Sequence, residues 1–152
     1  MAGPRPLDGV KVLDLSRVFA GPIAGRTLSD LGADVVKIEP PDGDVTRLWG
    51  RKTAGLSTYF TQQNCGKRNV CIDLQADGGP ELVLQLAEQA DVLIENFRPG
   101  VMAKFGLDWP TVHARHPELI MLSISGFGQD GPEAQRAAYA SIIHAESGIL
   151  PH

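Results

Sequence analysis

The stretch from residue 10 to residue 39 constrains the fold of this chain more than any other segment. Residues 11–15 alternate apolar and polar side chains after an Asp-Gly turn, a pattern typical of a β-strand. Gly21-Pro22 then opens a segment whose apolar residues recur at helical spacing, and Gly32 stands where such a helix would end. Residues 33–38 form a second apolar strand. This pattern predicts a βαβ unit, whose first turn lies at the carboxyl edge of a parallel sheet.

The rest of the chain continues this alternation. Further strands are predicted at residues 69–74, 91–95 and 119–124, and helices at 78–90, 100–106, 109–115 and 137–148. The long segment 40–67 begins with turn residues and contains a candidate short helix at 58–63. Because strands and helices alternate without an internal repeat or a linker, we expect an α/β fold with a doubly wound, mostly parallel sheet of five or six strands.

Composition excludes several classes of protein. The chain has 152 residues, of which 18 are acidic and 14 basic, and a net charge of −4 disfavours a generally basic nucleic-acid binder. No apolar run approaches the roughly 20 residues that span a bilayer. The first residues lack the apolar core of a signal peptide, so we expect a cytoplasmic protein without a membrane anchor. Cys65 and Cys71 form no CxxC pair and are expected to be reduced, with Cys65 buried.

Four predicted turns should gather at the carboxyl edge of the sheet, at residues 16–22, 39–44, 95–100 and 125–132. They offer backbone N–H groups and glycines, with Arg17, Arg47 and Arg98 nearby, which suits an anionic, phosphate-bearing ligand. Neither a GxGxxG nor a GxxxxGK[ST] motif is present, so the usual dinucleotide and P-loop sites are disfavoured. An equally open alternative is that the glycines only form turns and the arginines only face solvent.

Other chemical motifs are weak. His113 and His116 are spaced HxxH without a nearby acidic or cysteine ligand, so we expect no metal site. Ser123 and Ser125 lie in SISGFG, which lacks the GxSxG spacing of a nucleophile elbow.

Five sequence blocks occur in an order that is far more specific than any of these motifs. They are LDGVKVLDLSRVFAGP, LGADVVKIEPPDGD, NCGKRNVCIDL, ADVLIENFRPGVMAKFGL and SISGFGQDGP. Together, over about residues 6–150, the chain resembles the N-terminal part of the family III CoA-transferases. This group includes formyl-CoA and carnitine-CoA transferases and the homologous α-methylacyl-CoA racemase.

The resemblance implies a Rossmann-like large domain that binds coenzyme A, over residues 1–152, and dimers of interlocked chains. It implies acyl-CoA and a carboxylic acid as substrates, with no permanently bound cofactor. The implied CoA contacts are Val18, Phe19, Ala20, Ile72, Leu74, Gln75, Asn96, Phe97, Arg98, Lys104 and Phe105. Relatives often carry a basic residue where Pro40 and Pro41 stand, and Arg47 is the candidate substitute. Ser125 stands where some transferases have a lysine.

The family mechanism implies an aspartate that attacks the thioester and becomes an aspartyl-CoA thioester. That aspartate and the small domain lie beyond His152, so we expect no catalytic residue here and a CoA-binding chain that is inactive without a partner chain. The alternative is a non-catalytic CoA-binding module or subunit. Racemase chemistry is disfavoured, because Tyr139-Ala140 replaces the His-Asp pair of that branch. Ile142, Ile143 and Ile149 are candidates for an exposed apolar patch.

Overall fold

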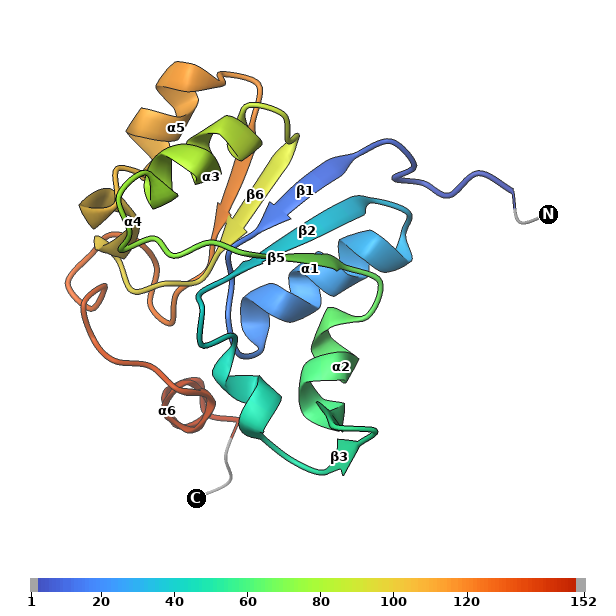
Figure 1. Ribbon diagram of the computed structural model, residues 1–152. Coiled ribbons are helices and arrows are strands. Elements are labelled where there is room, and N and C mark those ends of the chain that lie inside the picture. Colours follow the sequence, from blue (N-terminus) through green and yellow to red (C-terminus); the bar gives the residue numbers. More distant parts are fainter. Residues whose placement is uncertain (1–2, 150–152) are drawn as a thin grey trace.

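Five parallel strands form the centre of the molecule in the computed structural model, which describes residues 3–149 (Figure 1). They are β1 (Lys11–Asp14), β2 (Asp34–Glu39), β5 (Arg68–Cys71), β6 (Val92–Glu95) and β7 (Ile120–Ser123). The spatial order is β5-β2-β1-β6-β7, so the chain winds outward from β1 in one direction and then from β6 in the other. This is the doubly wound order predicted from the sequence, and it puts the switch point between β1 and β6.

Helices cover both faces of this sheet. Helix α1 (Ala20–Asp30) and helix α2 (Thr58–Asn64) lie on one side, while α3 (Gly79–Ala87), α4 (Val101–Lys104) and α5 (Trp109–Arg115) lie on the other (Figure 1). Successive strand residues serve the two faces in turn: Val12 packs in the layer under α1, and Leu13 packs in the layer under α3. Gly32 follows α1 with a φ of 115°, as expected of a residue that ends a helix.

The segment that follows β2 is ordered rather than a long loop. It forms the 3₁₀ helix η1 (Val45–Leu48), the short antiparallel pair β3 (Lys52–Thr53) and β4 (Leu56–Ser57), and then α2, close to the predicted short helix. The Asp44 side chain caps η1 by accepting a hydrogen bond from the Thr46 amide at 3.0 Å. The predicted short helix in this segment is therefore confirmed.

Two predicted elements are shorter than expected, one where the regular strand ladder ends and one in a helix without buried residues. The predicted strand 69–74 stops at Cys71, and the predicted helix 137–148 shortens to α6 (Ala140–Glu146), which has no buried residue. Ile142 and Ile143 of the predicted apolar patch are half-buried, and Ile149 is 70% exposed. Cys65 is exposed, as is Cys71, so the prediction of a buried Cys65 is wrong. No helix within residues 3–149 is long and apolar enough to cross a membrane.

Candidate functional site

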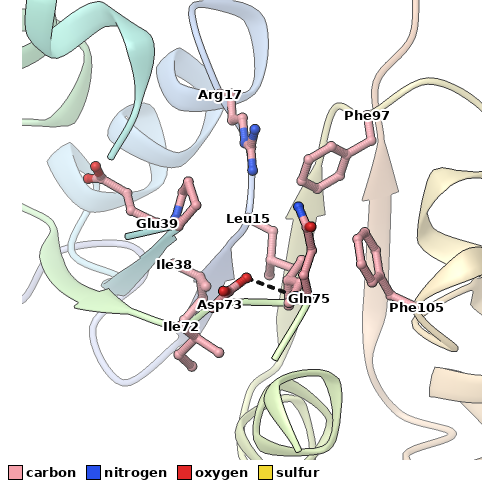
Figure 2. Close-up of a pocket in the computed structure, with 11 residues that line it drawn as sticks. Leu15, Arg17, Ile38, Glu39, Ile72, Asp73, Gln75, Phe97 and Phe105 are labelled. Carbon is pink, nitrogen blue, oxygen red and sulfur yellow. Dashed lines mark hydrogen bonds between the residues drawn. The ribbon is translucent and has the colours of Figure 1, made fainter. Parts of the chain in front are cut away.

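A pocket opens at the carboxyl edge of the sheet, across the switch point between β1 and β6 (Figure 2). Residues that follow β1, β2, β5 and β6 all contribute to it, because parallel strands end on the same side. The lining residues are Leu15, Arg17, Ile38, Glu39, Pro40, Ile72, Asp73, Leu74, Gln75, Phe97 and Phe105.

Apolar side chains form two facing walls of this pocket, and polar side chains share the rest of the lining. Figure 2 shows the Phe97 and Phe105 rings on one side and Ile38 and Ile72 on the other, with Leu15 between them. The backbone amide of Phe97 donates a hydrogen bond to the buried Glu95 carboxylate at 2.8 Å, which fixes the backbone at Phe97. Burial raises the pKa of Glu95, although hydrogen bonds from the Ser123 hydroxyl and the Phe97 amide oppose that effect.

Arg17 provides the positive charge at the pocket. Its guanidinium carbon lies 5.1 Å from the centre of the Phe97 ring, a cation–π distance. Within the described part of the chain, this guanidinium makes no ion pair and no hydrogen bond. An exposed arginine above aromatic and aliphatic walls can bind an anionic group of a ligand whose apolar portion enters the pocket.

The two carboxylates in the lining are already engaged. Glu39 forms two 2.7 Å hydrogen bonds with Arg47 and accepts from the amide of Asp44 and the side chain of Asn69. Burial alone would raise the pKa of Glu39, but these hydrogen bonds and the Arg47 charge lower it overall. Asp73 accepts from the Gln75 amide at 2.8 Å, as the dashed line in Figure 2 shows. Both oxygens of Glu39 are therefore engaged in local structure, and Asp73 uses Oδ1 to stabilise its own turn.

Beneath this edge lies a group of four buried, charged side chains, which we call the buried ion cluster: Asp14, Lys37, Asp44 and Lys67. The Lys67 ammonium lies 2.8 Å from Asp14, and the Lys37 ammonium lies 3.6 Å from Asp44. Burial lowers the pKa of Lys67, and the charge of Asp14 opposes that effect. For Asp44, hydrogen bonds from Thr46 and the charge of Lys37 outweigh burial, so its pKa is lowered.

The eleven implied CoA contacts divide into three groups. Five of them line the pocket: Ile72, Leu74, Gln75, Phe97 and Phe105. Val18, Phe19 and Ala20 form the β1–α1 turn beside it, and the Asn96 amide group binds the backbone of Arg17 in that turn. Arg98 and Lys104 are exposed and lie outside the lining.

Arg47, the candidate substitute for a missing basic residue, is paired with Glu39 and lies 3.7 Å from the Phe60 ring centre. Ser125 donates to the Gly128 carbonyl at 2.6 Å within its own turn. His113 stacks on Trp109, and residues 3–149 contain no cluster of three metal-ligating side chains. The sequence did not assign Leu15, Ile38 or Asp73 to the site, although Leu15 and Ile38 end predicted strands and Asp73 is the second-last residue of another.

The fold is that of a doubly wound α/β protein, and it has a pocket at its switch point. The family model described as CoA-transferase family III matches residues 7–151, and the chain belongs to that family.

Two curated relatives and a solved structure agree with this assignment. Succinyl-CoA–D-citramalate CoA-transferase of Chloroflexus aurantiacus is 45% identical over 96% of this chain and 37% of that protein. The succinyl-CoA–L-malate CoA-transferase alpha subunit of the same species is 44% identical over 95% of this chain and 34% of that subunit. A crystal structure of a CaiB/BaiF family protein from Brucella suis superposes with a TM-score of 0.92, at 47% identity, over 97% of this chain and 40% of that one. The chain thus spans less than two-fifths of the length of these curated relatives.

Proposed function

We propose that this chain forms the CoA-binding part of a CoA-transferase, which moves CoA between an acyl-CoA thioester and a carboxylic acid. The single observation that carries this proposal is the pocket at the switch point, where Arg17 lies beside Phe97, Ile72 and Phe105. CoA has an anionic nucleotide portion and an extended, less polar pantetheine arm. A cation beside apolar walls suits both portions, and the two curated relatives are named as a CoA-transferase and a CoA-transferase subunit.

The eleven implied contacts remain proposals with graded structural support. We place the apolar arm of the ligand against Ile72, Leu74, Phe97 and Phe105, and an anionic group at Arg17. Phe19 and Ala20 fit a backbone role, because Phe19 has no side-chain cap and the first amides of a helix lack internal partners. Arg98 and Lys104 fit a peripheral role in attracting an anion, since both are exposed.

Within residues 3–149, the lining carboxylates are tied to Arg47 and to the Gln75 amide, which supports binding rather than bond formation by this part of the protein. We therefore propose that the nucleophilic carboxylate comes from elsewhere in the enzyme. The second candidate function is that of a non-catalytic CoA-binding subunit. It is supported by the relative that is named as the alpha subunit of a CoA-transferase.

The partner is proposed to be a second copy of the chain or a chain that supplies further family sequence. The exposed apolar residues Ile120 and Leu122 on β7 support a covered surface in the assembled enzyme. Native mass spectrometry would show the assembly directly. The free thiols Cys65 and Cys71 support a cytoplasmic location, which stays a proposal.

Calorimetric titration of the 152-residue chain with CoA tests the binding proposal. We expect saturable binding that weakens about tenfold in Arg17→Ala, because one charged hydrogen bond is worth about 1.5 kcal/mol. Arg68→Ala is the matched control, since Arg68 is an exposed arginine paired with Asp34 at the opposite edge of the sheet. Absence of binding at millimolar CoA, or equal losses in both variants, would refute the proposed site.

A further inference from the structure

Val18 adopts a backbone conformation that its side chain disfavours. Its φ is 69°, in the left-handed region, where a β-branched residue is a clear outlier. Such a strained conformation persists only where surrounding contacts hold it. Val18 directly follows Arg17, whose side chain lines the pocket, so the contacts that hold Val18 also fix the origin of that side chain.

Asp44 makes the contact that holds this residue. The Val18 amide donates to Oδ2 of Asp44 at 3.1 Å, across 26 residues of sequence. The other carboxylate oxygen, Oδ1, accepts from the amide and the hydroxyl of Thr46 at 3.0 Å and 2.8 Å. Both oxygens are thus committed, and the Lys37 ammonium of the buried ion cluster lies 3.6 Å from Oδ2.

Neighbouring atoms of the turn are held in the same way from other strands. The Asn96 side chain accepts from the Arg17 amide at 2.7 Å and donates to the Arg17 carbonyl at 2.8 Å. The Lys37 ammonium donates to the Ser16 carbonyl at 2.5 Å. The turn is therefore fixed by Asn96, which follows β6, and by Lys37, which belongs to β2. Within the turn, Val18 is the residue with a strained backbone conformation.

We propose that Asp44 is a positioning residue of the ligand site, whose carboxylate holds Val18 in the left-handed conformation and thereby sets the place of Arg17 over the pocket. Asp44 is 1% exposed and lies outside the pocket lining, so it acts through the turn and not by touching ligand. This inference rests on the proposed function, in that its main test uses CoA.

The test is a double-mutant cycle between Asp44→Asn and Val18→Gly, measured as CoA affinity of the 152-residue chain by calorimetry. Asparagine has one acceptor oxygen, which cannot serve both the Val18 amide and the two donors of Thr46. Asp44→Asn should therefore release the turn and weaken CoA binding about tenfold. Glycine accepts a positive φ without penalty, so the same change in the Val18→Gly background should cost about threefold or less. Independent losses, with Asp44→Asn costing tenfold in both backgrounds, would overturn the inference.

Thr46→Val is the matched control, because it removes a donor from the same carboxylate but leaves the bond to Val18 intact. We expect it to lower thermal stability and to lower CoA affinity less than twofold; a tenfold loss would contradict the inference. If the unsubstituted chain fails to bind CoA, the proposed function falls instead. Hydrogen exchange in the unsubstituted chain gives a separate readout that needs no variant to fold. The Val18 amide should exchange at least 100-fold more slowly than an exposed amide, and unprotected exchange would also overturn the inference.

Discussion

The ammonium group of Lys67 lies 2.8 Å from the carboxylate of Asp14, and both side chains are almost fully excluded from solvent. Lys67 also donates to the Pro22 carbonyl and to the side chain of Asn64. The pair therefore connects the end of β1 with the first turn of α1 and the last residue of α2. Removing one partner would leave the other charge buried without compensation.

We predict that Lys67→Met lowers the free energy of unfolding by about 3–5 kcal/mol, the usual cost of breaking a buried ion pair. Urea unfolding at pH 7, followed by circular dichroism, measures this change. Arg68→Met is the control, because the pair between Arg68 and Asp34 is largely exposed, and its loss should cost less than about 1 kcal/mol. Equal costs in the two variants would show that the burial of the Lys67 pair has no energetic consequence.

Stability should fall in acid through the carboxyls of Glu39 and Asp44. Their pKa values in the folded protein are lowered from the ordinary 4.5 and 3.8. The unfolded chain therefore binds protons first as the pH falls, so the stability they contribute is complete above about pH 5 and is lost below their lowered folded values. Urea unfolding between pH 3 and pH 7 should show this decline.

In the same series, Glu39→Gln should be less stable at pH 7 by about 2 kcal/mol, because Arg47 loses its charged partner. Its decline toward pH 3 should be shallower than that of the unsubstituted chain. A Glu39→Gln curve parallel to that of the unsubstituted chain would mean that this carboxyl is not a source of the acid sensitivity.

Asn96→Ala should lower the free energy of unfolding by about 1–2 kcal/mol, because the Arg17 amide and carbonyl lose their side-chain partner. Thermal unfolding measures the effect. Gln89→Ala serves as the control, since Gln89 is exposed and its amide has only a 3.5 Å contact to a helix carbonyl. An unchanged melting temperature in Asn96→Ala would indicate that water replaces the side chain at no cost.

Gly21→Ala should destabilise the protein by about 1–3 kcal/mol through overpacking. A Cβ at this position would lie 2.1 Å from the Cβ of Ser16, which is fully buried, so either α1 or the turn must shift. Gly3→Ala is the matched control, because nothing lies within 4 Å of a Cβ there. Calorimetric melting of both variants decides the matter, and a fully tolerated Gly21→Ala would mean that α1 can move away from the turn freely.

Local patterns were enough to predict a doubly wound, mostly parallel sheet. The five strands, the helix α1 that begins near Gly21-Pro22 and the helix Trp109–Arg115 are all recognisable from apolar periodicity and turn residues. The ends of strands and helices were less predictable. Ile72, for example, is apolar and its amide still donates a hydrogen bond to Glu39 of β2, but the regular pairing of β5 with β2 ends at Cys71.

Only part of the site could be predicted in this way. Of the four turns predicted to gather, 16–22, 39–44 and 95–100 do contribute to one pocket, whereas no residue of 125–132 lines it. Ile72 was expected there only from the family resemblance. The buried ion cluster was not predictable, because Lys67 and Asp14 are 53 residues apart and no periodicity relates them. The exposure of Cys65 was missed because composition says only that free cysteines are often buried, and α2 ends at that residue on the surface.

The buried ion cluster has a consequence for anyone who redesigns this protein. Its charged side chains support the turn between β1 and α1. Ile72 and Phe105 line the pocket and are not members of this cluster. A substitution that resizes Phe105 would therefore change the shape of the pocket and leave these charges in place, whereas Ile72 also belongs to the apolar core. Substitutions at Asp44 or Lys37 would instead remove hydrogen bonds that reach the backbone of the turn at Val18 and Ser16.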